Sequence, residues 1–286
     1  MCLYTPAIQQ GLNYDIIKIM SIYPLSTDPV FHRFLLLAGI PAMQKLADTR
    51  VLVFGVGGVG SWCAEALVRS GIGNISMIDF DTVCVTNINR QIQALPSTVG
   101  ESKVCVLKKR LEEINPKCAI TVFDSIFSKE TAETFDIENA DYIIDAIDTV
   151  SNKLDLIEYA CEKRKIIYSS MGMAQKLDPS RIKIADIWKT EGCPLARLVR
   201  SGLRQRGFKG HFKTVYSNER LPVHKDLREL YNEEPRAFRK TVNGTSVTVT
   251  ATAGMTLASL ILQDIYYKYK DLHKDIHQDQ HKEELL

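Results

Sequence analysis

A glycine-rich turn early in the chain has the spacing of a phosphate-binding loop. Its glycines are Gly55, Gly57, Gly58 and Gly60. Glycine allows a tight turn and a close approach of the backbone to phosphate, and the following helix offers free N–H groups to an anion. Asp79 comes 24 residues after Gly55, where a carboxylate usually binds a ribose hydroxyl. The pattern predicts a nucleotide site and fits ATP as well as a dinucleotide.

Two cations and one carboxylate further along favour ATP. Arg90 and Lys103 supply positive charge, which a triphosphate needs beyond what one helix end provides, whereas dinucleotide dehydrogenases usually need none there. Asp148 follows a further predicted strand at the carboxyl edge of the sheet, where a carboxylate suits Mg²⁺ ligation between phosphates. The alternative is that Asp148 only caps the next helix. Asp145 is expected to be that cap or a structural partner.

Alternating strands and helices must position these residues. The predicted strands are the short apolar runs at 51–54, 75–78, 119–123, 142–146 and 166–170. The predicted helices are at 59–67, 101–114, 151–163 and 194–207. This rhythm predicts an α/β fold with a Rossmann-like, doubly wound, mainly parallel sheet covered on both faces. A strand at 247–250 and a helix at 256–267 are expected to close the sheet, within an antiparallel C-terminal part.

Composition excludes several classes of protein. Of 286 residues, 45% are hydrophobic and 24% are charged, which is typical of globular chains. The net charge of +2 gives no overall nucleic-acid signature, so any basic surface must be local. The seven cysteines form no C-x-x-C pair, which argues against such zinc motifs and a disulfide framework and for a reducing, cytoplasmic location. The longest uncharged run, 241–263, is rich in Ser and Thr, so no stable membrane insertion is expected.

Together these segments resemble the ThiF/MoeB/HesA family of adenylating enzymes, relatives of ubiquitin-activating enzyme. The resemblance rests on GVGGVGSWCAEAL (55–67), IDFDTVCVTNINRQ (78–91), TVGESK (98–103), INPKC (114–118) and DYIIDAID (141–148). It implies ATP and Mg²⁺ as cofactors, with Asp79 on the ribose and Asp148 on the metal. It also implies that Asn87, Arg90 and Lys103 contact phosphates. Asp81 and Gln91 are assigned to the same nucleotide site.

The resemblance also implies an oligomer and a domain layout. Arg33 falls where the family has an arginine that reaches the ATP of the other subunit, so a homodimer with Arg33 as a trans arginine finger is expected. The family domain would span 28–269, after an extension at 1–27. It would include a basic segment at 193–218 and an insert at 219–241. The charged tail at 270–286 carries His273, His277 and His281 at helical spacing, and a solvated helix is favoured there over a metal site.

Within the family the chain is similar to a branch of tRNA-modifying dehydratases. The similarity lies in the segments 169–179, 181–190 and 193–207. It implies adenylation of the carboxylate of threonylcarbamoyladenosine in tRNA, followed by ring closure with loss of water. A sulfur-transfer protein partner and a monovalent cation belong to the same expectation. Some members carry a cysteine where this chain has Thr214, so no cysteine is an evident acyl acceptor and a direct mechanism is implied, with Cys193 as the less favoured alternative.

The stretch from 195 to 218 is the expected tRNA surface because it has cations and no Asp or Glu. The cations are Arg197, Arg200, Arg204, Arg206, Lys209 and Lys213. Phe208, Phe212 and Tyr216 offer faces for base stacking, although a core position is favoured for them. Three other functions remain open at this point. They are an activator of a ubiquitin-like or sulfur-carrier protein C-terminus, an NAD-dependent oxidoreductase, and a non-catalytic scaffold that binds RNA or nucleotides.

Overall fold

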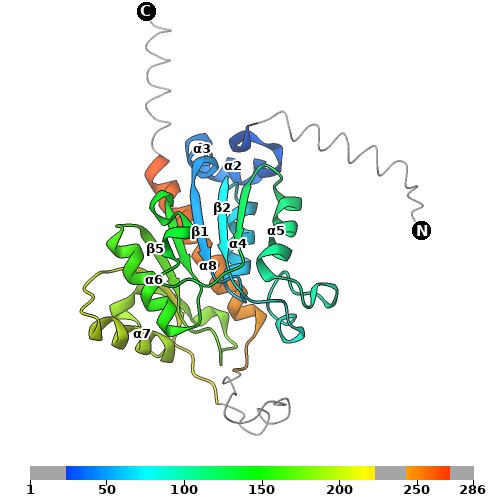
Figure 1. The fold of residues 1–286 in the computed structure, drawn as a ribbon. Helices are drawn as coiled ribbons and strands as arrows, with labels where there is room; N and C mark the ends of the chain where they lie inside the picture. Colours follow the sequence, from blue (N-terminus) through cyan, green and yellow to red (C-terminus); the bar gives the residue numbers. More distant parts are fainter. Residues whose placement is uncertain (1–23, 223–242, 271–286) are drawn as a thin grey trace, which may run out of the picture.

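A seven-stranded sheet crosses the molecule in the computed structural model, which describes residues 24–222 and 243–270 (Figure 1). The strand order is β3-β2-β1-β4-β5-β7-β6, and only β6 and β7 pair antiparallel. The strands are β1 Arg50–Phe54, β2 Asn74–Ile78, β3 Ala119–Phe123, β4 Tyr142–Asp145, β5 Ile166–Ser170, β6 Ile182–Asp186 and β7 Lys213–Ser217. The predicted fold class, with its antiparallel C-terminal part, is confirmed.

Helices pack on both faces of this sheet (Figure 1). They are α2 His32–Ala38, α3 Ile40–Asp48, α4 Gly60–Arg69, α5 Lys103–Ile114, α6 Val150–Glu162, α7 Pro194–Gln205 and α8 Val247–Tyr269. Short 3-10 turns lie at Leu25–Thr27, Pro29–Phe31, Val85–Asn87, Pro96–Thr98, Ala132–Phe135, Ile137–Asn139, Pro179–Arg181 and Ile187–Lys189. The five predicted strands, and the helices predicted at 59–67, 101–114, 151–163 and 194–207, lie within two residues of the observed bounds. The helix predicted at 256–267 begins nine residues earlier, at Val247.

Alternate residues of each central strand enter two separate cores, because successive side chains of a strand point to opposite faces. Val51 and Val53 of β1 pack with α4, α5 and α8 on one face. Leu52 and Phe54 of the same strand pack with α6 and α7 on the other. The uninterrupted apolar runs of the sequence therefore reflect a sheet that is buried on both sides.

The predicted strand at 247–250 is wrong, because these residues form the first turn of α8. The Ser246 hydroxyl caps that turn by accepting a hydrogen bond from the backbone N–H of Thr248 at 3.3 Å. Val249, Ala253 and Leu257 are fully buried against the sheet and α4, at the spacing of one helix face. The β-branched residues locally favour a strand, but burial of this face against the rest of the domain outweighs that propensity.

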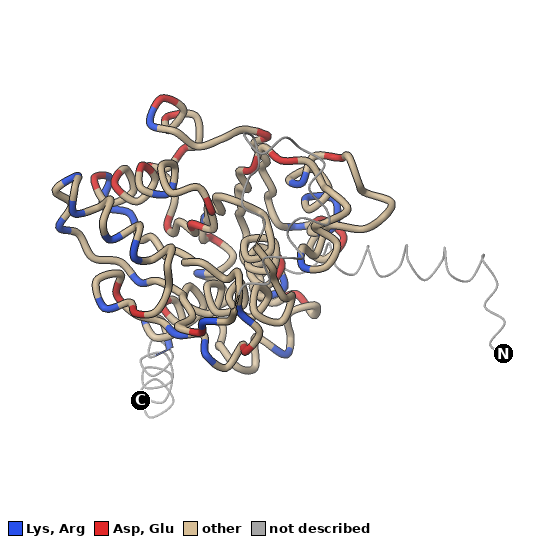
Figure 2. The backbone as a smooth tube through the Cα atoms, turned by 90° about the horizontal axis from the view of Figure 1, so that it is seen from below, with Lys and Arg blue, Asp and Glu red and all other residues tan. Residues whose placement is uncertain are grey.

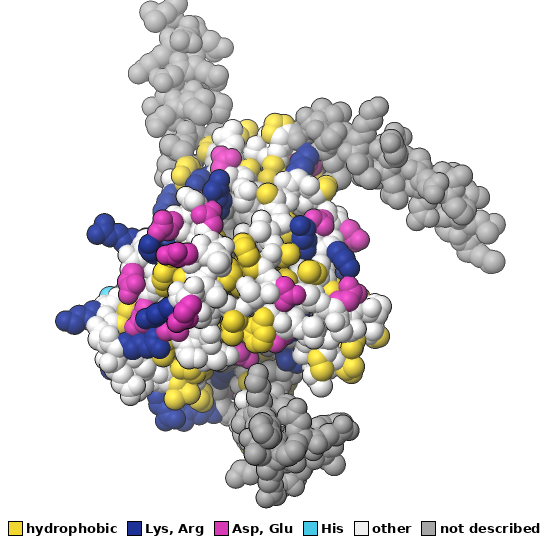
Figure 3. Space-filling model, in the orientation of Figure 1, with side chains coloured by type: hydrophobic (Ala, Val, Ile, Leu, Met, Phe, Trp, Pro, Cys, Tyr) yellow, Lys and Arg dark blue, Asp and Glu magenta, His cyan; other side chains and the backbone are white. Residues whose placement is uncertain are grey.

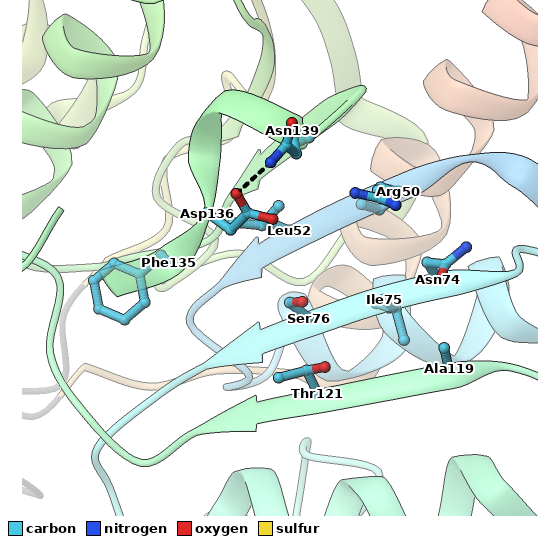
Figure 4. Close-up of a pocket in the computed structure, with 12 residues that line it drawn as sticks. Arg50, Leu52, Asn74, Ile75, Ser76, Ala119, Thr121, Phe135, Asp136 and Asn139 are labelled. Atoms are coloured by element: carbon cyan, nitrogen blue, oxygen red, sulfur yellow. Dashed lines mark hydrogen bonds between the residues drawn. The ribbon is translucent and has the colours of Figure 1, made fainter. Parts of the chain in front are cut away.

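The face of the sheet next to β3 lacks the long helix that the doubly wound pattern predicts. Between β3 and β4 the described chain forms only the turns Ala132–Phe135 and Ile137–Asn139. These turns leave a cavity of about 170 Å³ over the first halves of β1, β2 and β3. Figure 4 shows it lined by Arg50 and Ser76, with Asn139 donating a hydrogen bond to Asp136 at 2.7 Å. None of the predicted nucleotide-site residues lines this cavity.

Three predicted regions lie wholly or mainly outside the described residues. They are the extension at 1–27, most of the insert at 219–241, and the tail with His273, His277 and His281. Within 24–222 and 243–270, no helix is long and apolar enough to cross a bilayer.

Candidate active site

The predicted nucleotide-binding residues lie on loops at the end of the sheet where the strand order reverses, between β1 and β4. The loops that follow β1 and β4 lead to helices on opposite faces of the sheet. Open α/β sheets bind ligands at such a switch point. The two loops are tied to the sheet by Gly55 N–H to Ile78 O and Ala146 N–H to Phe54 O, both at 2.8 Å. The glycine-rich loop and the Asp148 loop therefore lie side by side at the carboxyl ends of β1 and β4, and the region that they border is here called the crevice.

Glycine is required by packing at some positions of the loop and not at others. A Cβ on Gly60 would lie 1.8 Å from Gly55 O, and a Cβ on Gly55, whose φ is +85°, would lie 2.8 Å from Ala146 O. A Cβ on Gly57 would meet only Gln91 Nε2, at an ordinary 3.8 Å. Packing within the protein therefore does not require glycine at position 57. This is expected of a position whose space is reserved for a phosphate.

Asp79 lies at the end of β2 and is bonded to the glycine-rich loop. Its Oδ2 accepts from Val56 N–H at 2.7 Å, and its Oδ1 accepts from Asp81 N–H at 2.9 Å. Burial raises the pKa of this carboxyl, although the charge of Lys103 and the two N–H groups oppose the shift. Asp79 therefore holds the loop in place from the position predicted for ribose binding.

Lys103 starts α5 and forms an ion pair with Asp81, with Nζ 2.7 Å from Oδ2. The Lys103 side chain is 6% exposed, whereas that of Asp81 is 51% exposed. The structure thus brings the predicted phosphate cation to the Asp79 loop but gives it a carboxylate partner.

Arg90 is fixed by the chain around it. Its Nη1 donates to Thr86 O at 2.8 Å and to Asn89 Oδ1 at 2.9 Å. Burial lowers the pKa of its guanidinium, and the charge of Asp148 opposes that shift. The side chain also lies against the loop, since a Cβ on Gly58 would be 3.2 Å from Arg90 Cγ. Arg90 therefore reaches the crevice between both loops.

Asn87 and Gln91 are buried supports of the Arg90 segment. The Asn87 Oδ1 accepts from Cys84 N–H at 3.1 Å, which closes the turn before Arg90. Gln91 is 5% exposed, and its amide lies behind Gly57. The structure places both residues beside the crevice, where they shape the loops.

Asp148 is exposed at the mouth of the crevice, and Asp145 is completely buried behind it. Only the Thr149 hydroxyl donates to the Asp148 carboxylate among the described residues, at a long 3.4 Å. Asp145 is the structural partner of the two, since it pairs with Lys153 at 2.6 Å. No cluster of three or more His, Cys, Asp or Glu capable of holding a metal lies in the described part of the chain. A single carboxylate fits Mg²⁺, which usually takes its remaining ligands from phosphate and water.

Three supports of the site were missed by the sequence patterns. Gln93 Nε2 donates to Val56 O at 2.8 Å, and Trp62 Nε1 donates to Arg90 O at 2.9 Å. The first turn of α8 supplies Thr250, whose Cβ would be 3.3 Å from a Cβ on Gly58. Trp62 lies inside the glycine-rich motif and Gln93 just after the 78–91 motif, but nothing in their spacing indicates a partner far along the chain.

Arg33 lies at the opposite end of the sheet from the crevice. It is exposed on α2, next to Phe31, whose ring would be 3.7 Å from a Cβ on Gly71, just before β2 begins. Figure 1 shows α2 and α3 together at the end of the molecule from which β1 starts. Within one chain the structure therefore does not bring Arg33 to the predicted site.

The basic segment places its exposed cations along α7 and the turn after it. Arg197, Arg204 and Lys209 are exposed, and Arg204 stacks over the Trp188 ring at 5.4 Å from its centroid. Arg200 is half-buried and donates to the Thr190 hydroxyl. Figure 2 shows groups of blue positions on the side of the molecule where Figure 1 places α7, and Figure 3 shows cationic side chains projecting there.

Other members of that segment serve the fold. Arg206 bonds to Asp155 at 2.6 Å and to Glu158 at 2.9 Å, so its charge is compensated by α6. Phe212 and Tyr216 are 6% and 3% exposed, which makes them core residues and leaves them unable to stack on a base. For Phe212 and Tyr216 the favoured prediction of a core position is confirmed.

Cys193 is an unsuitable acyl acceptor in this conformation. It is 3% exposed at the start of α7, and its thiol contacts Gly172 O at 3.9 Å. Thr214, which stands where some family members have cysteine, is also fully buried and donates to Ala185 O at 2.9 Å. Both side chains are buried, whereas Asp148 is exposed.

The fold is a Rossmann-like sheet, and a glycine-rich loop, Asp79 and the cations Arg90 and Lys103 lie at its switch point. These features define a nucleotide-binding α/β protein. The chain belongs to the ThiF family, whose model matches residues 31–281. A tRNA threonylcarbamoyladenosine dehydratase of Bacillus subtilis is 41% identical over 239 residues, covering 82% of this chain and 94% of that protein. A protein of the same name from Haemophilus influenzae is 38% identical over 224 residues, covering 77% and 82%.

A solved structure extends the comparison to the fold. It is the crystal structure of Escherichia coli tRNA N6-threonylcarbamoyladenosine dehydratase in complex with ATP. The two folds match with a TM-score of 0.73 at 36% sequence identity, covering 83% of this chain and 94% of that one. The similarity therefore runs along most of both chains.

Proposed function

We propose that this chain is an ATP-dependent, AMP-forming tRNA threonylcarbamoyladenosine dehydratase. The observation that carries the proposal is one crevice that combines a Gly57 open to phosphate with Asp79, Arg90 and Asp148. The similarity of most of the chain to dehydratases, one of them in complex with ATP, supports the choice of substrate. An NAD-dependent oxidoreductase would leave Arg90 and Lys103 without a purpose.

The chemistry has two steps. A carboxylate oxygen of the threonylcarbamoyl side chain attacks the α-phosphorus of ATP, and pyrophosphate leaves. An atom of the same side chain then attacks the acyl-adenylate carbonyl, loses its proton and expels AMP, so that the nucleoside has lost one water overall. Adenylation turns a poor leaving group into a good one, and intramolecular attack benefits from a high effective concentration.

Each site residue has a role in this reaction. The amides of the glycine loop, Arg90 and Lys103 bind phosphates, and Asp79 binds the ribose. Asp148 would hold Mg²⁺, which when bound offsets the charge of the departing pyrophosphate. Asn87 and Gln91 hold the surrounding loops in shape, and Asp81 pairs with Lys103 in the absence of nucleotide. A requirement for a monovalent cation is part of the proposal and is tested by replacing K⁺ with an organic cation.

We place tRNA on the exposed cations of α7, and we propose a homodimer that completes the site. Arg33 shares one face of α2 with Leu36 and Leu37, which are 70% and 72% exposed. Figure 3 shows hydrophobic side chains at this upper end of the molecule, over α2 and α3. Burying these leucines between two copies would give Arg33 a route to the partner's ATP. Sedimentation of the Leu37→Glu variant tests the dimer, and a shift to monomer with loss of turnover is expected.

One experiment tests the substrate and the reaction together. The protein is mixed with ATP, Mg²⁺ and tRNA that carries threonylcarbamoyladenosine, and the digested nucleoside is weighed by mass spectrometry. Loss of one water with formation of AMP is expected. An unchanged nucleoside together with active ATP–pyrophosphate exchange would instead favour the activation of a carrier-protein C-terminus. Adding a sulfur-transfer protein then tests whether such a partner raises the rate.

A further inference from the structure

Lys153 and Asp145 form an ion pair that is completely buried, with both side chains 0% exposed and Nζ 2.6 Å from Oδ2. Lys153 also donates to Ser170 O at 3.0 Å and to Ser169 Oγ at 3.3 Å, while Ser169 Oγ donates to Asp145 Oδ2 at 2.5 Å. All these groups lie behind the crevice and cannot touch ATP. A buried ion pair often contributes no more to stability than apolar residues of similar volume would. Stability alone therefore does not explain why this pair is present.

The network joins three elements to the loop that carries Asp148. Asp145 ends β4, Lys153 lies in the first turn of α6, and Ser169 lies at the end of β5. The remaining oxygen of Asp145 accepts from Ile147 N–H at 3.1 Å, inside the 146–149 loop. Lys153 therefore fixes Asp145, and Asp145 in turn fixes the loop backbone next to Asp148.

Two further backbone bonds hold the ends of the same loop, Ala146 N–H to Phe54 O at 2.8 Å and Lys153 N–H to Thr149 O at 3.0 Å. Asp148 and Thr149 between them are exposed, so the Asp145–Ile147 bond is the one that reaches the middle of the loop. Because Mg²⁺ demands near-ideal geometry, a carboxylate that supplies one of its ligands must be held closely in position. Groups behind a metal ligand commonly change metal affinity or activity by about 10–100-fold when they are removed.

We propose that the buried Lys153–Asp145 pair is a positioning device that sets the 146–149 loop so that Asp148 presents its carboxylate to Mg²⁺ at the ATP phosphates. Lys153 and Asp145 are positioning residues, since neither reaches the reacting atoms. The inference rests on the proposed function for the metal and the nucleotide. The conformation of the 146–149 loop, in contrast, can be measured on the chain without ligand.

Two readouts on Lys153→Met test the device. Amide hydrogen exchange on the ligand-free chain should show faster exchange at 146–149 than in the wild type. Calorimetry should show ATP affinity in EDTA within about twofold of wild type, while the gain in affinity on adding Mg²⁺ falls by about tenfold or more. Unchanged loop exchange together with an unchanged Mg²⁺ gain would overturn the proposal.

Two further variants separate positioning from general loss of stability. Arg110→Met breaks a partly exposed ion pair to the buried Glu65 on the opposite face of the sheet, where Nε and Oε2 are 2.6 Å apart, and it should leave both readouts unchanged. Ser169→Ala keeps both charges and tests the device if Lys153→Met does not fold; a wild-type loop and Mg²⁺ gain in that variant would overturn the proposal. If the wild type binds no ATP, the proposed function fails, and loop exchange alone still decides on the positioning.

Discussion

Lys103 and Asp81 form an ion pair, 2.7 Å apart, at the edge of the nucleotide crevice. The lysine is buried and its partner is half exposed. If Lys103 binds a phosphate as proposed, ATP must compete with Asp81 for this cation.

Replacing Asp81 with Asn should therefore strengthen ATP binding, because it removes the competing carboxylate. A partly exposed ion pair contributes up to about 1 kcal/mol, so the gain should be up to about fivefold in affinity. Isothermal titration at low salt measures it. The Glu101→Gln variant is the control, since it removes the partner of Lys109 at 3.0 Å and should not alter ATP binding. Weaker binding by Asp81→Asn would mean that Asp81 itself holds the nucleotide.

Arg90→Ala and Asp148→Ala should each abolish turnover without unfolding the chain. Asp148 is exposed and Arg90 bonds mainly to neighbouring loop atoms, so neither carries the core. ATP–pyrophosphate exchange should fall by about 10²-fold or more, as for the loss of other charge-stabilising groups. Thermal melting checks the fold. Full activity in either variant would show that the residue has no role in adenylation.

Two glycines of the loop should respond differently to alanine. Gly60→Ala places a methyl group 1.8 Å from Gly55 O, so the loop and helix α4 must shift and the melting temperature should drop. Gly57→Ala meets no close atom of the protein, so the fold should be unchanged while ATP affinity falls by about tenfold or more. Melting curves and ATP titration on both variants provide the comparison. Normal ATP binding by Gly57→Ala would remove this loop from the phosphate site.

Charge reversal at Arg197 and Arg204 should weaken tRNA binding and leave ATP binding intact. Both side chains are exposed on α7, and phosphate contacts of this kind also determine salt dependence. Filter binding should show a loss of about tenfold or more near physiological salt and a shallower salt slope. The matched control is Lys108→Glu with Lys109→Glu on α5, which changes the net charge equally at another site. An equal loss in both double variants would point to overall charge and not to α7.

Glu65 should make stability depend on pH in the acidic range. Burial raises the pKa of its carboxyl, but hydrogen bonds and charges from Arg110 and Arg69 outweigh this and lower it below the usual 4.5. Because the folded pKa is the lower one, this stabilisation is present above about pH 4.5 and is lost as the pH falls through the folded value. Glu65→Gln should cost about 1–3 kcal/mol of unfolding free energy at pH 7. Urea unfolding should show the difference from wild type shrinking towards pH 3, and a constant difference would contradict the prediction.

Local patterns identify most of the sheet because they depend on neighbouring residues alone. The apolar runs around 51–54 and 142–146, and the glycines that follow the first of them, are recognisable without tertiary structure. The same patterns fail at Val247–Thr250, where β-branched residues enter a helix because α4 buries their face.

The sequence by itself determined the family, the nucleotide motif and the residues that could meet phosphate and metal, since each depends on residue type at short spacing. Only the tertiary structure decided which partners those residues have. It pairs Lys103 with Asp81 across 22 positions, and Asp145 with Lys153 behind the crevice. It also leaves Arg33 at the far end of the sheet. Such contacts arise when packing brings distant segments together, and no local spacing encodes them.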